Sequence, residues 1–243
     1  MPQRLDKHLV ALGLAKTRSR AQMLIDEGAV TVNGAVTRKA SHSVSEADDI
    51  QLTHNPIPWV SRAALKLVAA LDAFEIDASG KTALDLGAST GGFTQVLLSR
   101  NANKVIAVDV GHDQLEDSLR TDPRVQVLER TNVRDLDQLG LQVVDLIVSD
   151  LSFISLLKAL PTPLMLAAEN AHLIALIKPQ FEVGKAHIGK GGIVRDTQAI
   201  RCACANISTF LEQSGWDILG LIESPIKGGD GNTEYLVGAR RLT

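Results

Sequence analysis

From residue 60 onward, short apolar runs alternate with helical patterns, and this alternation constrains the fold more than any other feature of the sequence. The apolar runs cover residues 82–86, 104–109, 125–128, 143–149 and 172–178. Strands that are separated by helices usually pair in parallel and are covered by helices on both faces. The sequence therefore predicts an α/β fold built on a largely parallel sheet.

The end of the chain breaks this alternation. Residues 216–224 and 233–241 are both strand-like, and only the short Gly-rich segment "PIKGGDGN" joins them. So short a connection indicates a hairpin. We therefore expect a sheet of seven strands in which the last strand is antiparallel.

The first part of the chain has a different pattern, which predicts a small α+β domain over residues 1–54. Leu5, Leu9 and Leu12 recur at helical spacing, and Thr17 can cap a second helix. Asn33-Gly34 is a strong signal for a tight turn between two short strands. Residues 44–52 resemble one further strand.

Two prolines divide the domains. Pro56 and Pro58 favour a stiff, extended segment, so we expect a linker at residues 55–60 and a second domain over residues 61–243.

Charge is unevenly distributed, although the net charge is only −3. Residues 1–40 hold seven Lys and Arg residues against three acids. Such a cluster indicates either a surface for an anionic partner or a solvated face, and composition alone favours the second.

No apolar run is long enough to span a membrane, and there is no signal peptide pattern. Cys202 and Cys204 fit neither a disulfide framework nor a zinc spacing, so we expect free thiols in a cytoplasmic protein.

The segment "ALDLGASTGGFT" reads as a strand, a Gly-rich turn and the start of a helix. Asp109 closes the next strand, where an acid can accept hydrogen bonds from a ribose diol. The spacing G-x-x-x-G-G fits the dinucleotide fingerprint poorly. Together with the strand-end acid it resembles the class I methyltransferases, which have a Rossmann-like sheet and bind S-adenosylmethionine.

That resemblance implies a set of cofactor-binding residues. The glycines would let a ligand approach the backbone, and Asp85 would face the methionine amino group. The implied residues are Asp85, Gly87, Ser89, Thr90, Gly91, Gly92, Phe93, Asp109, Val110, Asn132, Val133 and Asp150.

Several charged residues stand at positions where the sheet would gather them. Asp150 and Lys178 close strands that should be neighbours, so we expect them side by side. Arg62 and Lys66 are predicted to share the polar face of a helix, and Glu234 begins the last strand. A lysine with a free pKa of about 10.4 becomes a base only through desolvation or a neighbouring cation. Each residue alone is best explained as a surface ion pair; the set at one edge favours a functional reading.

These positions carry a more specific resemblance. Residues 60–241 resemble the FtsJ-type ribose 2'-O-methyltransferases, whose Lys-Asp-Lys-Glu tetrad falls on Lys66, Asp150, Lys178 and Glu234. Residues 2–53 resemble an S4-type RNA-binding domain. With "PWVSRAALKL", "DLSFISL", "KPQFEVG", "GGIVRD" and "GNTEYL", nearly the whole chain is similar to the TlyA family, often labelled hemolysin.

The resemblance implies S-adenosylmethionine-dependent 2'-O-methylation of cytidines in ribosomal RNA, with Lys178 as the general base. Ribosomal RNA or ribosomal subunits would be the partner, and neither a metal nor a membrane is implied. The residues expected to contact RNA are Arg4, Lys7, Lys16, Arg18, Arg20 and Arg62. Two alternatives remain: an RNA-binding assembly factor without catalysis, and a membrane-active hemolysin.

Overall fold

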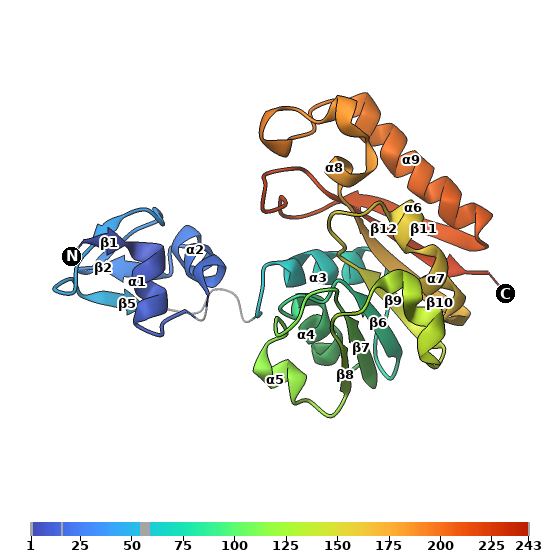
Figure 1. The fold of residues 1–243 in the computed structure, drawn as a ribbon, viewed down its shortest axis with the longest axis horizontal. Helices are drawn as coiled ribbons and strands as arrows, with labels where there is room; N and C mark the ends of the chain where they lie inside the picture. Colours follow the sequence, from blue (N-terminus) through green and yellow to red (C-terminus); the bar gives the residue numbers. More distant parts are fainter. Residues whose placement is uncertain (1, 16, 54–58, 243) are drawn as a thin grey trace. The chain divides into compact units, whose positions relative to one another are not determined.

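The computed structural model describes residues 2–15, 17–53 and 59–242, and the chain forms two compact units, Met1–Arg62 and Ala63–Thr243 (Figure 1). Lys16 and the prolines of the expected linker, Pro56 and Pro58, lie outside the described residues. Each unit is considered by itself below.

The smaller unit is α+β, as its sequence predicts. Its elements are β1 (Gln3–Arg4), α1 (Leu5–Ala11), α2 (Arg18–Asp26), β2 (Val30–Val32), β3 (Ala35–Val36), β4 (Ser43–Val44) and β5 (Ile50–Leu52). The expectation of one strand over residues 44–52 is wrong, because β4 pairs with β1 and β5 pairs with β2 in a separate sheet. The apolar pattern of this stretch could not show that its two ends serve different sheets.

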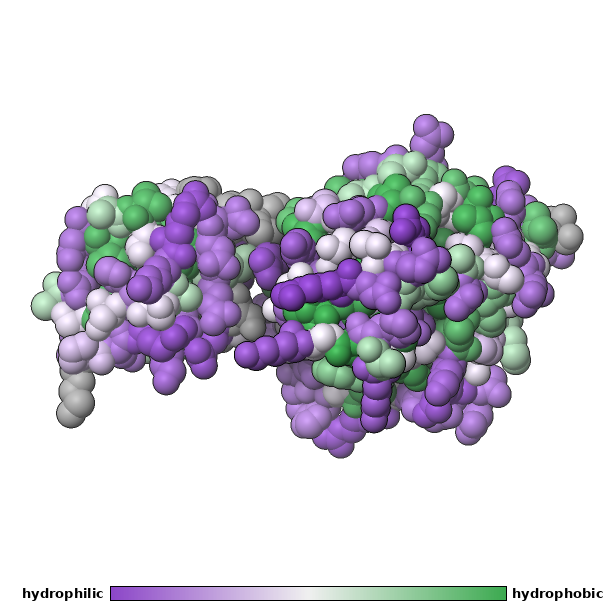
Figure 2. All heavy atoms as spheres, turned by 90° about the horizontal axis from the view of Figure 1, so that it is seen from above, coloured by the Kyte–Doolittle hydropathy of each residue, from purple (hydrophilic) through white to green (hydrophobic). Residues whose placement is uncertain are grey.

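Most local signals in the smaller unit are confirmed, but Leu12, the third residue of the predicted helical pattern, follows the end of α1 and is 51% exposed. The Thr17 hydroxyl accepts a hydrogen bond from the backbone N–H of Arg20 at 3.2 Å and so caps α2. Asn33 and Gly34 both have positive φ, as a tight turn between β2 and β3 requires. Leu5, Leu9 and Ile25 are fully buried in the core of the unit. On the face seen in Figure 2, hydrophilic side chains cover most of this unit.

The larger unit alternates strands and helices. Its strands are β6 (Thr82–Leu86), β7 (Lys104–Val108), β8 (Val125–Leu128), β9 (Val144–Ser149), β10 (Ala167–Ile177), β11 (Trp216–Glu223) and β12 (Tyr235–Arg241). Its α-helices are α3 (Ala63–Ala73), α4 (Gly92–Ser99), α5 (Asp117–Arg120), α6 (Leu156–Ala159), α7 (Pro161–Met165), α8 (Pro179–Glu182) and α9 (Thr197–Gln213). Three 3-10 segments are η1 (Val133–Leu139), η2 (Lys185–His187) and η3 (Lys190–Gly192).

The seven strands form one sheet in the order β11-β12-β10-β9-β6-β7-β8. β6 to β10 are parallel, and β12 is antiparallel to both of its neighbours. The predicted α/β class, the seven strands and the antiparallel last strand are confirmed. β12 is last in the chain but not at the edge of the sheet, because it lies between β10 and β11.

Helices cover both faces of the sheet (Figure 1). α3 and α4 pack on one face, and α9 packs on the other with α6 beside it. Cys204 and Ile207 of α9 are buried in the main core together with Leu173 and Val237 of the sheet, whereas Cys202 is exposed. This arrangement explains why the central strands are apolar on both sides.

The strand register explains how distant residues reach one edge of the sheet. Ser149 of β9 pairs with Ala175 of the parallel strand β10, so Asp150 and Lys178 leave the sheet at the same edge. β12 runs the opposite way, and its first residue, Tyr235, pairs with Ile177. The residue that precedes β12 therefore lies beside the carboxyl ends of the parallel strands.

Candidate active site

A cavity of about 450 Å³ opens at the carboxyl edge of the sheet, within the range of about 300–1,000 Å³ typical of small-molecule sites. The predicted cofactor residues that line it are Gly87, Ser89, Asp109, Val110, Asn132, Val133 and Asp150. Seven other lining residues were not predicted from the sequence: Val108, which precedes Asp109, and the six residues Gly111, Gln114, Leu151, Ser152, Phe153 and Ile154. These six follow strand-end acids directly or by a few positions, and this proximity is the signal that could have identified them.

The remaining predicted cofactor residues do not line the cavity. Asp85, Thr90, Gly91, Gly92 and Phe93 belong to the strand, turn and helix behind its wall. A Cβ on Gly91 would lie 2.3 Å from a methyl group of Leu119, and a Cβ on Gly87 would lie 2.9 Å from the Asp150 carbonyl oxygen. These contacts give a further reason for the two glycines: they let the protein pack closely against the turn.

Asp85 is fully buried beneath the Gly-rich turn. Its Oδ2 accepts a hydrogen bond from the Thr94 hydroxyl at 2.7 Å, while its Oδ1 has no partner within the described residues. Burial raises the pKa of Asp85 to about 7, with a further contribution from the negative charge of Asp150. A buried carboxylate oxygen without a donor is costly, and a bound cation or hydrogen-bond donor would lower that cost.

Asp109 stands at the end of β7 with both oxygens turned to backbone donors. Oδ2 accepts from the N–H of Ser89 at 2.8 Å, and Oδ1 accepts from the N–H of Gly111 at 2.7 Å. An ionised carboxylate has about four acceptor positions, so each oxygen keeps capacity for one more donor. This is the arrangement that a ribose diol can use.

Glu129, which follows β8, organises the loop after Asp109. Its carboxylate accepts hydrogen bonds from the backbone N–H groups of Asp113, Gln114 and Leu115, and from Arg120. Although partial burial acts to raise it, the Arg120 ion pair and the backbone donors lower the pKa of Glu129 to about 2. Gln114, a lining residue of the cavity, is therefore held by an acid that sequence analysis did not single out.

Lys178 and Asp150 lie side by side, as the sequence predicts. The ammonium nitrogen of Lys178 is 2.7 Å from Asp150 Oδ1, a close ion pair without hydrogen-bond geometry, and it donates to the Ser152 hydroxyl at 2.7 Å. Asp150 is also a lining residue of the cavity. The same carboxylate thus connects the cavity with the lysine.

Lys66 forms the second ion pair of the site. Its ammonium nitrogen lies 2.6 Å from Glu234 Oε2, and both side chains are buried. The predicted polar face of the helix is wrong, because α3 begins at Ala63, after Arg62, and Lys66 is buried alongside Leu67 rather than opposite the core. Burial raises the pKa of Glu234, against the opposing effects of Lys66 and of Lys178.

A second carboxylate fastens the segment after Lys178 to the segment after Asp150. Glu182 accepts a hydrogen bond from the Ser155 hydroxyl at 2.7 Å and one from the N–H of Leu156 at 2.8 Å. Burial raises the pKa of Glu182, and the two hydrogen bonds act in the opposite direction by lowering it. Both strand-end segments are thus tied together a few residues beyond the ion pair.

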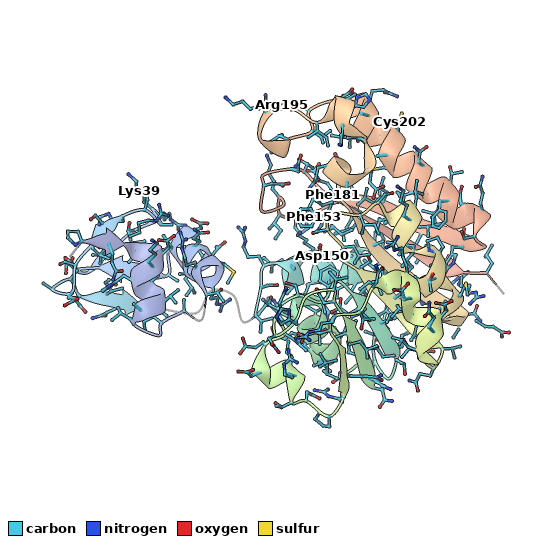
Figure 3. All side chains as sticks on the ribbon, viewed as in Figure 1. Lys39, Asp150, Phe153, Phe181, Arg195 and Cys202 are labelled. Atoms are coloured by element: carbon cyan, nitrogen blue, oxygen red, sulfur yellow. The ribbon has the colours of Figure 1, made fainter. Side chains whose placement is uncertain are left out.

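An aromatic pair lies at the opening of the site. Phe153 and Phe181 follow Asp150 and Lys178 by the same number of positions, and their ring centroids are 5.2 Å apart (Figure 3). Phe153 is 90% exposed and has a φ of +66°, which is unfavourable for a residue with a large side chain. An exposed aromatic ring in a strained backbone beside a cavity indicates a contact surface for a ligand.

The residues expected to contact RNA fall in the smaller unit. Arg4, Lys7 and Arg18 are exposed, and Arg20 is partly buried, with its guanidinium group donating to the Trp59 carbonyl at 2.6 Å. Arg62 is exposed as well. Lys16 lies outside the described residues.

Two kinds of feature are absent from residues 2–15, 17–53 and 59–242. No group of three or more His, Cys, Asp and Glu side chains comes together there in a way that could hold a metal ion. None of the helices in this part of the chain is long and apolar enough to cross a lipid bilayer.

Comparisons with known proteins show which families the two units match. Residues 59–241 match the FtsJ-like methyltransferase family, and residues 3–50 match the S4 domain. The chain is 46% identical over 243 residues to the 16S/23S rRNA (cytidine-2'-O)-methyltransferase TlyA of Mycobacterium tuberculosis, covering 99% of this chain and 90% of that protein. It is 40% identical to Hemolysin A of Brachyspira hyodysenteriae, covering 96% and 98%.

Solved structures of other proteins share the fold of this chain. A protein described as a hemolysin from Streptococcus thermophilus superposes with a TM-score of 0.78 at 35% identity, over 99% of this chain and 89% of that one. A methyltransferase from Listeria monocytogenes, 17% identical, shares the fold of the larger unit with a TM-score of 0.57. The chain belongs to the TlyA family, in which an S4 domain precedes an FtsJ-like methyltransferase domain.

Proposed function

We propose that this protein transfers a methyl group from S-adenosylmethionine to the ribose 2'-hydroxyl of a cytidine in ribosomal RNA, with Lys178 as the general base. The observation that carries the proposal is the position of Asp150, which lines the cavity and lies 2.7 Å from the Lys178 ammonium nitrogen. The name of the Mycobacterium tuberculosis relative supports the choice of cytidine and of ribosomal RNA. We expect the enzyme to act in the cytoplasm, where ribosomal RNA is made and assembled.

The residues of the cavity fit S-adenosylmethionine. Asp109 has free acceptor capacity for the ribose diol, and Val110 and Val133 offer apolar surface for a purine ring. Asp85 lies outside the lining of the cavity, but its Oδ1, which has no partner among the described residues, suits the cationic methionine amino group, directly or through water. When bound, the cofactor supplies an activated methyl group on a sulfonium centre.

The lysine has the contacts that a base needs. Asp150 and Ser152 occupy two of the directions in which the Lys178 nitrogen can make contacts, which leaves one for a substrate hydroxyl. Positive charge nearby and exclusion of water favour the neutral form of a lysine. Lys178 would then accept the 2'-hydroxyl proton as the oxygen attacks the methyl carbon, and Asp150 would hold the resulting ammonium group in place.

The buried pair Lys66–Glu234 supplies a second, oriented cation near the reaction centre. Glu234 holds the Lys66 ammonium group at 2.6 Å and also feels the charges of Lys178 and Asp150. Lys66 would orient the ribose. The four charged residues thus act as one set, as the FtsJ-type tetrad implies.

RNA would be held mainly through its phosphates. The described basic residues of the smaller unit, Arg4, Lys7, Arg18 and Arg20, together with Arg62, are proposed for this contact, and the S4 match supports it. The phosphates fix the position of the RNA, whereas the choice of nucleotide depends on contacts around the cavity.

The test uses the full chain and ribosomal RNA transcribed without modifications. Lys178→Ala should abolish transfer of tritiated methyl groups to RNA while RNA binding is retained, and Lys158→Ala, an exposed lysine of α6, should transfer at the wild-type rate. Mapping of the labelled nucleotide gives the target. Transfer by Lys178→Ala at the wild-type rate would refute the role of the lysine. RNA binding without any transfer by the wild type would favour the assembly-factor alternative.

A further inference from the structure

The smaller unit contains one fully buried carboxylate, Asp6, among the described residues with charged side chains. Asp6 Oδ1 accepts from Arg4 Nε at 3.0 Å and from the N–H of Lys7 at 2.9 Å. Its Oδ2 accepts from Arg4 Nη2 at 3.0 Å, Arg18 Nη2 at 2.9 Å and Gln22 Nε2 at 3.1 Å. Hydrogen bonds from Arg4 and then Arg18 hold the pKa of Asp6 well below its usual range, against the effect of burial.

These contacts bring together residues from three elements. Arg4 ends β1, Asp6 lies in the first turn of α1, and Arg18 begins α2. The carboxylate is hidden from solvent, whereas the side chains of Arg4 and Arg18 are 44% and 53% exposed. The side of this cluster that faces solvent therefore carries two positive charges and no negative charge.

The geometry leaves a usable edge on each guanidinium group. Arg4 approaches Asp6 with the edge formed by Nε and Nη2, so its Nη1 donors point away from the carboxylate because the group is planar. Arg18 contacts Asp6 through Nη2 alone. Two guanidinium groups fixed on one anchor suit a phosphodiester, which accepts paired, charge-assisted hydrogen bonds.

We propose that Asp6 is a positioning residue that fixes Arg4 and Arg18 as one phosphate-binding fork for RNA. Side chains that are already ordered in the free protein lose less conformational freedom on binding. The inference rests on the proposed RNA substrate and goes beyond it, because it assigns the binding strength to arrangement as well as to charge.

The fork and a purely electrostatic surface predict opposite signs for one substitution. Asp6→Asn removes a negative charge from beneath a basic surface. Charge alone would make RNA binding tighter, whereas a fork that loses its anchor binds RNA more weakly. Removing a buried partner also destabilises a fold, so folding of this variant has to be followed by circular dichroism.

Charge-preserving variants test the fork without that complication. Arg4→Lys and Arg18→Lys change half-exposed side chains and keep the charge, but lysine lacks the planar donor edge. Arg38→Lys is the matched control, since Arg38 contacts the Asp26 carbonyl rather than Asp6. The measurements are the dissociation constant for unmodified large-subunit ribosomal RNA across a salt series, and KM and kcat for methyl transfer.

We expect Arg4→Lys and Arg18→Lys each to bind RNA roughly tenfold more weakly with an unchanged salt slope, because no charge is lost. The loss should fall on KM for RNA rather than on kcat, and folded Asp6→Asn should also bind more weakly. Wild-type affinity in both lysine variants, or tighter binding by folded Asp6→Asn, would refute the phosphate-binding fork but leave the proposed function standing. A wild-type protein that binds no RNA would overturn the proposed function as well.

Discussion

Lys66 and Glu234 are 168 positions apart in the chain, yet their charged groups lie 2.6 Å from each other in a buried pair. Lys66 comes from α3 and Glu234 from the residue before β12. They meet because β12 is antiparallel, so that its beginning lies at the edge where the parallel strands end. An antiparallel last strand is thus what delivers an acid to the proposed active site.

Variants of this pair should show that its contribution to stability can be restored without restoring activity. Glu234→Gln leaves the Lys66 charge buried without its partner, so we expect destabilisation of about 3–5 kcal/mol, the usual cost of breaking a buried pair. The double variant Lys66→Met/Glu234→Leu should regain most of that stability but remain inactive. Thermal unfolding and methyl transfer measure the two effects. Recovery of activity in the double variant would exclude a catalytic role for the pair.

Asp85 should make the stability of the cofactor-free protein depend on pH. Its folded pKa of about 7 exceeds the ordinary pKa of 3.8 for an aspartate, so the folded state binds more protons between these values and stability falls as pH rises from about 4 to 7. Asp85→Asn should lack this decline. The measurement is the unfolding free energy across that range, and an identical decline in the variant would assign it to other groups.

The same ionisation should affect cofactor binding in the opposite sense. The Asp85 carboxylate has to be ionised to attract an ammonium group, so affinity for S-adenosylmethionine should increase as pH rises from about 6 to about 8. Titration calorimetry of the wild type and Asp85→Asn at both pH values tests this. Equal pH dependence in both proteins would contradict direct or water-mediated contact with Asp85.

Glu129→Gln should weaken cofactor binding without a change in the reacting groups. The ionised carboxylate accepts from three backbone N–H groups and from Arg120, and an amide has only one oxygen to do so. We expect the dissociation constant for S-adenosylmethionine to rise several-fold while kcat at saturating cofactor is nearly retained. Asp122→Asn, which loses a surface pair with Arg124, is the control.

The low pKa of Glu129 also predicts how this contribution varies with acidity. Its stabilising effect is complete above the unfolded pKa of about 4.3 and is lost as pH falls toward the folded value of about 2. The difference in stability between wild type and Glu129→Gln should therefore shrink below about pH 4. A constant difference across that range would show that the charge of Glu129 is not the cause.

Glu182 should act through the position of its neighbours. Glu182→Ala removes both acceptors for Ser155 and Leu156, so the segment carrying Asp150 loses its tie to the segment carrying Lys178. Glu182→Gln can keep both contacts, since its oxygen accepts from Leu156 and its amide donates to Ser155. We expect kcat to fall in the alanine variant and to be largely rescued in the glutamine variant. Equal loss in both would point to the charge rather than to positioning.

The sequence determined the fold to a large extent, because its signals are local. Apolar runs separated by helical patterns require a covered, largely parallel sheet, and the short connection before residue 233 requires a hairpin. The sequence alone predicted that Asp150 and Lys178 lie side by side, because the carboxyl ends of neighbouring parallel strands meet at one edge of the sheet. The resemblance added the tetrad as a set.

Only the tertiary structure decided what surrounds these residues. The pattern of α3 placed Lys66 on a polar face, but packing buries it against Glu234, because a charged group can be buried where a partner compensates it. Likewise, Asp6 looks like one acid among many basic residues, and its role as an anchor depends on two helices and a strand meeting around it. Periodicity records which positions face the core, whereas compensation between charges distant in the chain arises only when the elements come together.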